Sequence, residues 1–204
     1  MAQMDAAYAR PELYWGREAN TLCRHVCALV PPSGARGARA IDLGAGEGRD
    51  AVALARHGFQ VTAVDISLPG LRKAAAWAAT EGLELEIRQA DILQLRLQDA
   101  YGLVYSSGTL NHLPAERRRA TFDRWRAHTA PGGYHALNVF VEKPFIAPPP
   151  DWGPDEYFFR SGELLSLYWD WEVVYFEEEI FECTSSGVPH RHAMDTLIAR
   201  RVAS

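Results

Sequence analysis

Short apolar, β-branched runs alternate with stretches of helical spacing, and this alternation restricts the possible folds more than any other feature of the chain. The runs are ARAIDL, QVTAVDI, LELEIRQAD, YGLVYSS and YHALNVFV. Strands that alternate with helices form a parallel sheet, because each helix carries the chain back to the start of the next strand. The pattern predicts an α/β fold, a doubly wound sheet of about seven strands with helices on both faces.

Glycine, serine and proline mark where the crossover helices begin and end. Gly48 and Gly58 flank the first helix, while Ser67 and Pro69 begin a second helix that ends before Gly82. Two later strand-like runs, WEVVYFEEEIFEC and HAMDTLIARR, are joined by the turn-rich TSSGVP. They predict an antiparallel C-terminal hairpin that closes an otherwise mostly parallel sheet.

Composition and charge exclude several classes of partner. At 204 residues, 48% of them hydrophobic, the chain can bury one substantial core, which predicts one domain. A formal net charge of −5 leaves no basic surplus for nucleic acid or an anionic membrane. No apolar run approaches the roughly 20 residues that span a bilayer. The segment MAQMDAAYAR lacks the features of a secretory signal. The three cysteines suggest no disulfide framework. We expect a cytoplasmic monomer or homodimer with small-molecule partners.

The segment RAIDLGAGEGRD places a glycine-rich turn between the first strand and the first helix. Such a turn aims backbone N–H groups and the helix dipole at a bound ligand. In dinucleotide-binding proteins the spacing is G-x-G-x-x-G, but here Gly44, Gly46 and Gly48 alternate and Arg49 follows. The third glycine is one residue early, so the turn fits S-adenosylmethionine, which carries an amino-acid zwitterion in place of a pyrophosphate, better than NAD.

Acidic residues stand at the ends of three successive predicted strands. Asp42 is placed to hold the ammonium group of the cofactor, and Asp65 to accept both ribose hydroxyls. Asp91 is a third carboxylate at the same edge. Any one of them alone could equally be a turn former or a helix cap. Their joint placement around the glycine turn favours a cofactor site.

At this point the chain resembles the class I S-adenosylmethionine-dependent methyltransferases, through DLGAGEG, VDIS, ADIL, SSGTLNHL and APGGY. It is also similar to the tellurite-resistance TehB-like methyltransferases, through GRDAVALARHGFQVTAVD and FFRSGELLSLYWDWEVVYFEE. The resemblance covers about residues 14 to 201 and implies a Rossmann-like fold, and we expect a single methyltransferase domain over residues 1–204. We divide that domain into an N-terminal helical segment (1–37), a cofactor-binding core (38–142), a proline and aromatic substrate loop (143–160), and a C-terminal helix and hairpin (161–204).

The resemblance also implies which residues hold the cofactor and its product, S-adenosylhomocysteine. By this resemblance, Asp91 approaches the adenine amino group of the cofactor, and Ile92 packs on the adenine ring. The full cofactor-binding set is Asp42, Gly44, Ala45, Gly46, Arg49, Asp65, Ile66, Asp91, Ile92 and Ser107.

Methyl transfer from a sulfonium requires in-line positioning and exclusion of water, and neither a metal nor a catalytic triad. His112 is the candidate base, and Arg160 the candidate cation beside an acceptor; a solvated His112 and an Arg160–Glu163 ion pair are the alternatives. The candidate acceptor contacts are Tyr14, Trp15, Asn111, Trp152, Tyr157, Phe159, His190 and His192. For any single aromatic residue, ordinary packing is an equally good interpretation.

The identity of the acceptor rests on the resemblance alone. A TehB-like enzyme implies a tellurium or selenium oxyanion or a related chalcogen compound. The alternatives are a small organic thiol, amine or hydroxyl metabolite, and a non-catalytic S-adenosylmethionine-binding module. His190 and His192 alternate on a predicted strand without an obvious third ligand, so no metal site is predicted there. The basic run ERRRATFDRWRAH predicts a solvated helix face over buried Phe122 and Trp125.

Overall fold

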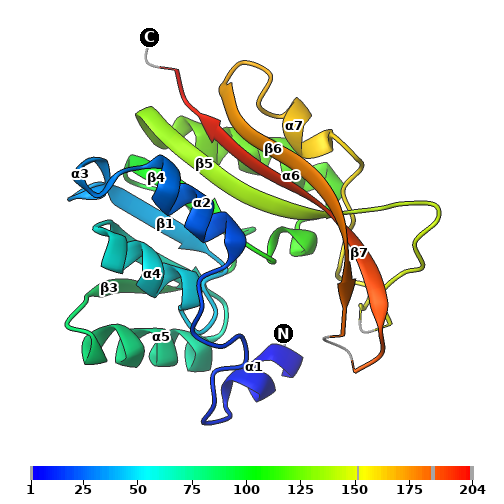
Figure 1. Ribbon diagram of the computed structural model, residues 1–204, viewed down its shortest axis with the longest axis horizontal. Coiled ribbons are helices and arrows are strands. Elements are labelled where there is room, and N and C mark those ends of the chain that lie inside the picture. Colours follow the sequence, from blue (N-terminus) through cyan, green and yellow to red (C-terminus); the bar gives the residue numbers. More distant parts are fainter. Residues whose placement is uncertain (1, 151, 185–186, 203–204) are drawn as a thin grey trace.

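The computed structural model describes residues 2–150, 152–184 and 187–202. Within them one sheet of seven strands has the order β3-β2-β1-β4-β5-β7-β6 (Figure 1). Its strands are β1 (Arg39–Leu43), β2 (Gln60–Asp65), β3 (Leu85–Gln89), β4 (Tyr101–Ser106), β5 (Thr129–Val141), β6 (Glu172–Cys183) and β7 (His190–Arg200). The first five pair in parallel and the last two antiparallel, which confirms the predicted mostly parallel sheet with a C-terminal hairpin.

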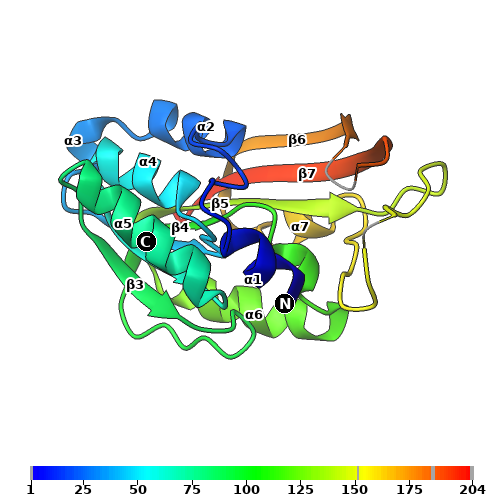
Figure 2. The same cartoon turned by 90° about the horizontal axis from the view of Figure 1, so that it is seen from below.

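Helices cover both faces of this sheet, as predicted (Figure 2). They are α1 (Ala2–Tyr8), α2 (Thr21–Leu29), α3 (Pro32–Ala35), α4 (Arg49–His57), α5 (Leu68–Thr80), the 3-10 turn η1 (Leu110–His112), α6 (Ala115–Ala127) and α7 (Glu163–Ser166). Gly58 ends α4 in the left-handed conformation, and the Ser67 hydroxyl caps α5 with a bond from the N–H of Gly70. Each of these end signals agrees with the prediction. No helix in the described residues is long and apolar enough to cross a membrane.

Alternation along the strands sorts the core into two layers. Ile41 and Leu43 of β1 face the layer that contains Phe122 and Trp125 of α6. Ala40, which precedes Ile41 and points to the opposite face, faces the layer under α2, α4 and α5. The two helix layers lie on opposite sides of the sheet in Figure 2. The predicted burial of Phe122 and Trp125 is confirmed, since both are fully buried.

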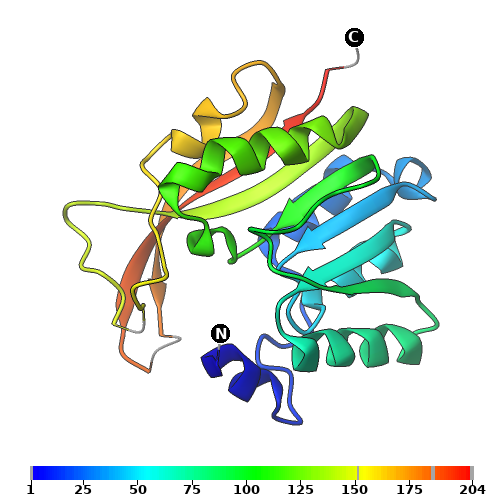
Figure 3. The same ribbon diagram turned by 180° about the vertical axis from the view of Figure 1, so that it is seen from behind.

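The hairpin joins the sheet through its second strand. β7 pairs with β5 on one side and β6 on the other, so β6 is the edge strand. Acidic residues of the FEEEIFE run lie on this exposed edge, where charge opposes pairing with another chain. Figures 1 and 3 show the free end of the hairpin on the same side of the molecule as α1.

The fifth strand is longer than predicted. It begins at Thr129, five residues before the expected start at Tyr134, and its register with β4 shifts between Tyr101 and Leu103. The shift absorbs the extra residues around Gly132, which has a φ of 75°. The residues around Gly132 and Gly133 therefore form a bulge within β5, because the chain keeps pairing on both sides of the glycines.

Candidate cofactor and acceptor site

The glycine turn lies at the point where the strand order reverses. β2 and β3 lie on one side of β1, and β4 and β5 lie on its other side. The order of the strands along the chain therefore reverses its direction across the sheet at β1. In open α/β sheets ligands bind in the crevice outside such a switch point, at the carboxyl ends of the strands. The sequence thus put its glycines at the position where this fold binds ligands.

All three glycines of the turn have positive φ, at 89°, 53° and 85° for Gly44, Gly46 and Gly48. A Cβ on Gly44 would lie 2.0 Å from the Thr109 hydroxyl, and one on Gly48 would lie 2.5 Å from the Cβ of Ala74. Side chains are thus excluded both by conformation and by space. The early third glycine has its own function, since it lets α5 pack directly against the turn.

Two buried carboxylates lie beside the turn. Asp42 is 2% exposed and Asp50 is 6% exposed. Burial raises the pKa of Asp42 well above its usual value, and the negative charges of Asp50 and Asp65 raise it further. Asp50 accepts bonds from the Tyr105 hydroxyl at 2.9 Å and from the N–H of Asn20 at 2.7 Å. This pocket repels anions and favours a cation.

Asp65 ends β2 against the glycine turn. Its Oδ2 accepts from the N–H of Gly46 at 2.8 Å, and its Oδ1 accepts from the N–H of Ser67 at 2.7 Å. Burial raises the pKa of this carboxyl, while the backbone bonds oppose the shift. Ile66, the next residue, is 40% exposed and offers an apolar surface beside the carboxylate. A ribose hydroxyl and a flat base are the groups that this pair suits.

The remaining predicted cofactor residues differ in how far they are buried and in their hydrogen-bond partners. Asp91 is half-buried and accepts from the N–H of Leu93 at 2.8 Å, while Ile92 is 7% exposed and packs into the core. Ser107 is half-buried, and its hydroxyl accepts from the side-chain amide of Asn138 at 3.2 Å. Ala45 and Arg49 are half-buried at the turn, and Arg49 lies 3.5 Å from Asp50. The whole set therefore lies at or near one edge of the sheet.

The N-terminal segment is anchored directly to the glycine turn by Glu47. This carboxylate is buried, pairs with the Lys73 ammonium at 2.6 Å, and accepts from the N–H of Tyr14 at 2.7 Å. Tyr14 and Trp15 are each nearly half exposed, and the indole N–H of Trp15 donates to the Tyr8 hydroxyl at 3.1 Å. That hydroxyl lies 2.7 Å from where a Cβ on Gly46 would stand. The two predicted N-terminal aromatics are thus held beside the cofactor turn.

Asn111 and His112 follow β4 on the η1 turn. The backbone carbonyl of Asn111 accepts from the N–H of Tyr157 at 2.6 Å, which joins η1 to the proline and aromatic loop. Asn111 is 6% exposed, and its Oδ1 has no hydrogen-bond partner among the described residues. His112 is exposed, and its Nδ1 donates to the carbonyl of Asp155 at 3.3 Å. An unsatisfied buried acceptor of this kind calls for a donor from a ligand or water.

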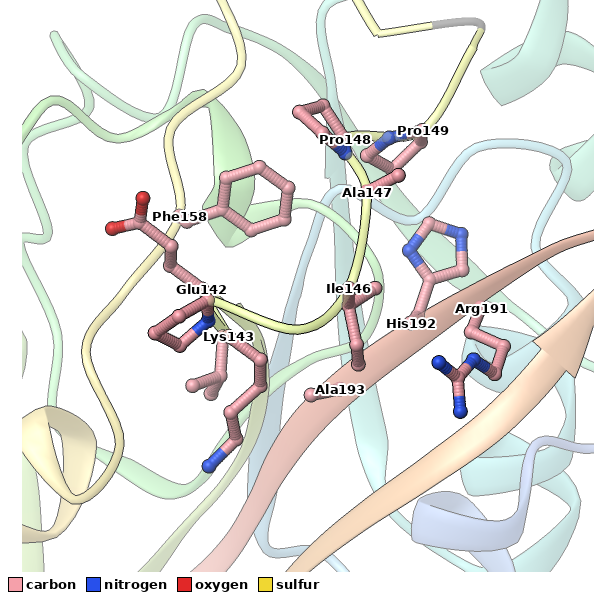
Figure 4. A pocket seen from close by; sticks show the side chains of 12 residues that line it. Glu142, Lys143, Ile146, Ala147, Pro148, Pro149, Phe158, Arg191, His192 and Ala193 are labelled. Atoms are coloured by element: carbon pink, nitrogen blue, oxygen red, sulfur yellow. The ribbon is translucent and has the colours of Figure 1, made fainter.

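The proline and aromatic loop and the hairpin enclose a cavity of about 180 Å³. Glu142 and Lys143, just after β5, lie on one side of it, and Arg191 and His192 of β7 lie on the other (Figure 4). Trp152 stacks on Phe158 with ring centroids 4.5 Å apart. No residue of the glycine turn lines this cavity, so it is separate from the cofactor edge.

Three interpretations from the sequence need correction. Phe159 is fully buried and pairs with β5 through the N–H bond to Phe140, so it is a core residue and cannot touch an acceptor. Phe158, its neighbour, lines the cavity instead. The alternation of a strand decides this, because adjacent residues point to opposite faces.

The basic helix is not merely solvated. Arg118 is 4% exposed, and its guanidinium lies 3.6 Å from the Phe159 ring centroid. It donates to Glu163 at 2.8 Å and to the carbonyl of Phe158 at 2.8 Å. A buried guanidinium is stable only when its donors are satisfied in this way.

Arg118 also changes the interpretation of Arg160. Glu163 accepts from the backbone N–H of Arg160 at 2.9 Å and pairs its carboxylate with Arg118, so the alternative interpretation, a side-chain ion pair between Arg160 and Glu163, is wrong. The Arg160 side chain is exposed and does not line the cavity. Its contact with an acceptor stays a prediction.

Sequence reasoning missed several residues that build the site. Tyr8, Glu47 and Thr109 shape the glycine turn, and Asn138 holds the loop after β4 through its bond from the N–H of Gly108 at 2.8 Å. Glu47 alone carried a signal, since it stands inside the glycine turn. The others come from distant segments and gave no local pattern.

Comparison with known proteins agrees with this geometry. Residues 40–133 match the methyltransferase domain family. The probable S-adenosyl-L-methionine-dependent methyltransferase TehB of Haemophilus influenzae is 24% identical over 95% of this chain and 68% of its own length. The crystal structure of TehB from that organism superposes with a TM-score of 0.77 at 23% identity, over 88% of this chain and 61% of that one.

Hemagglutinin 1 of Eikenella corrodens is 30% identical over 80% of this chain and 54% of its own length, so the chain spans about half of that relative. The glycine turn and the acidic pocket agree with these findings, which identify residues 40–133 as a methyltransferase domain with S-adenosylmethionine as its cofactor. The chain as a whole is similar to the TehB-like S-adenosylmethionine-dependent methyltransferases.

Proposed function

We propose that this chain transfers a methyl group from S-adenosylmethionine to a small-molecule acceptor. The observation that carries the proposal is the acidic pocket beside three glycines of positive φ. A dinucleotide would bring a pyrophosphate to this turn, and Asp42, Asp50 and Asp65 would repel it. The ammonium and sulfonium of S-adenosylmethionine are attracted by the same charges.

Different residues are proposed to bind three parts of the cofactor, which are its ammonium, its ribose and its adenine base. Asp42 is assigned to the ammonium, Asp65 to the ribose, and Ile66 to the base, with Asp91 and Ile92 on the adenine side. Bound S-adenosylmethionine supplies the methyl group as a sulfonium. Tyr14 and Trp15, held over the turn by Glu47, exclude water from the reacting pair.

The acceptor site is assigned to the loop after β4. A nucleophile must come within about 3 to 3.5 Å of the methyl carbon, in line with its bond to sulfur. Thr109 contacts Gly44, and Asn111 lies two residues further with its buried Oδ1 available to accept a hydrogen bond. Asn111, Tyr157 and Trp152 are therefore proposed to contact the acceptor, with His112 as the base. The cavity behind Phe158 adjoins this place.

The size of the cavity supports a small acceptor. Pockets for drug-sized ligands have volumes of about 300 to 1,000 Å³, and the cavity beside the site measures about 180 Å³. A tellurium or selenium oxyanion, as the TehB-like resemblance implies, is within this size. Small thiols, amines and hydroxyl metabolites are within it as well. Arg160 is the proposed cation beside an oxyanion, and Arg191 lines the cavity.

Calorimetry with S-adenosylmethionine, S-adenosylhomocysteine and NAD tests the cofactor assignment. We expect the first two to bind and NAD not to bind. Because burial raises the pKa of Asp42, the bound cation should release a proton, and affinity should increase as pH rises through that raised pKa. An Asp42→Asn variant should lose both the proton release and the pH dependence. Binding of NAD alone would overturn the assignment.

A methyl-transfer assay over selenite, tellurite, small thiols, amines and phenols tests the acceptor. Wild type is compared with Arg160→Ala and with His112→Ala. An oxyanion acceptor predicts a loss of activity in Arg160→Ala, and a base predicts that His112→Ala lowers kcat at neutral pH. An enzyme that prefers an uncharged organic acceptor, with Arg160→Ala as fast as wild type, would remove the oxyanion. Cofactor binding without turnover on any acceptor would favour a non-catalytic binding module.

A further inference from the structure

Three metal-ligating side chains meet at the free end of the β6–β7 hairpin. Cys183 is the last residue of β6, and His190 and His192 are the first and third residues of β7. The sulfur of Cys183 and one nitrogen from each imidazole all lie within 4.8 Å of one another. The antiparallel register pairs Cys183 with His190, and strand alternation brings His192 to the face of His190. Cys183 is thus the third ligand that was not apparent in the sequence.

The two imidazoles are already oriented toward a shared point. Nδ1 of His190 lies 2.7 Å from the carbonyl of Val188, and because a carbonyl can only accept, Nδ1 carries the proton. In the neutral ring Nε2 then keeps its lone pair, and it lies 2.9 Å from Nε2 of His192. Histidines that bind metals usually donate their other N–H to a carbonyl or carboxylate, which fixes the tautomer. His190 has this arrangement.

The chemistry of the three donors selects the ion. Two imidazole nitrogens and one thiolate suit Zn²⁺ or a soft transition ion, whereas Mg²⁺ and Ca²⁺ take oxygen ligands. In a tetrahedral zinc site, bond lengths of about 2.0 to 2.3 Å put the ligand atoms roughly 3.3 to 3.7 Å apart. The observed separations, from 2.9 Å to at most 4.8 Å, bracket that range.

The surroundings of His192 resemble the shell of a metal site. Its ring is buried against Phe140, Phe181 and Trp152, with centroid distances of 4.8, 5.5 and 5.8 Å. An apolar shell limits the access of water and strengthens the bonds between ligand and metal. His192 also lines the cavity of Figure 4, so a fourth ligand can reach the ion from there.

From these observations we propose that Cys183, His190 and His192 bind one zinc ion at the free end of the hairpin. Three protein ligands leave one position of a tetrahedral ion for water or a small anion. The ion also ties the end of β6 to the start of β7. This site is separate from the glycine turn and does not depend on the proposed methyl transfer.

Metal binding by the untagged, full-length chain tests the proposal. After treatment with a chelator, the protein is titrated with Zn²⁺ by calorimetry, and its metal content is measured. Co²⁺ serves as a spectroscopic probe, because a cysteine ligand produces a thiolate-to-cobalt charge-transfer band. We expect one zinc per chain, and at least about tenfold weaker binding in Cys183→Ser and in His190→Ala. The cobalt band should disappear in Cys183→Ser.

Cys27→Ser is the matched control and should bind zinc as wild type does. Cys27 is half-buried on α2, which contacts β6 at Tyr175, near the end of that strand opposite to Cys183. Circular dichroism verifies that each variant is folded, and His190→Gln replaces His190→Ala if the alanine variant is not. The proposal is overturned if wild type binds no stoichiometric zinc. It is also overturned if both ligand variants bind zinc as tightly as wild type, in which case the two histidines share only a hydrogen bond.

Discussion

The proposed cofactor edge and the proposed acceptor side of this protein are assembled in different ways. At the cofactor edge, Asp42, Gly44 and Asp65 each stand within a few residues of a strand end, and their spacing along the chain shows where they meet. On the acceptor side, residues come from three separate segments, which are η1, the proline and aromatic loop, and the hairpin. The first arrangement is local, and the second depends on contacts between distant segments. The first is therefore predictable from a motif, and the second is not.

The largest expected effect concerns a contact of the acceptor side that no motif indicated. Arg118→Ala removes a buried guanidinium from Glu163 and from the carbonyl of Phe158, and should lower the free energy of unfolding by about 3 to 5 kcal/mol. Arg119→Ala, on the exposed face of the same helix, should change it by less than about 0.5 kcal/mol. Urea denaturation measures both. Equal effects would mean that the acceptor side does not depend on Arg118.

A slightly smaller effect is expected from the motif itself. Gly48→Ala combines a φ of 85° with a Cβ 2.5 Å from Ala74, and should cost about 2 to 4 kcal/mol of stability. Gly82→Ala is the control, because Gly82 has a φ of 69° with no atom within 4 Å of the new Cβ. It should cost only about 1 to 2 kcal/mol. If the two variants unfold at the same urea concentration, the close approach of α5 contributes nothing.

The third prediction separates binding from folding at the cofactor edge. Asp65→Ala removes the proposed ribose acceptors and should weaken S-adenosylmethionine binding by about 1.5 to 3 kcal/mol, measured by calorimetry. Asp99→Ala, which removes an exposed carboxylate paired with Arg39, should leave the affinity unchanged. Unchanged affinity in a folded Asp65→Ala would show that the ribose binds elsewhere.

The smallest expected effect is a pH dependence of the folding stability, which arises from Asp195 in the hairpin. Burial, and then the charge of Glu178, raise the pKa of Asp195 from its ordinary 3.8 to about 6. The folded chain holds this proton more tightly than the unfolded chain, so this group's contribution to stability falls as pH rises from about 4 to 6. Because nearby charges are partly screened by solvent, we expect a fall of about 1 to 2 kcal/mol.

Urea denaturation at several pH values compares wild type with Asp195→Asn, which keeps an oxygen to accept from the N–H of Gly162. The wild-type curve should fall relative to the variant between pH 4 and 6, and the two should run parallel above pH 7. Parallel curves over the whole range would contradict the raised pKa of Asp195.

Sequence periodicity predicted the sheet, the hairpin and the limits of α4 and α5 because each follows from local rules. Gly58 ends a helix wherever the chain needs a left-handed residue, and alternating apolar residues define a strand in any context. The assignment of Phe159 failed for the opposite reason. Pairing with β5 decides whether Phe158 or Phe159 faces the core, and no residue near them indicates that pairing.

The sequence by itself predicted the cofactor, since the glycine turn and the strand-end carboxylates lie close along the chain and together favour S-adenosylmethionine over a dinucleotide. The tertiary structure alone decided three other features. It buried Arg118 under Phe159, it left Arg160 exposed, and it brought Cys183 to His190 and His192. The physical reason is that these contacts depend on strand register and on which helix covers which face, and both are set by packing of the whole chain.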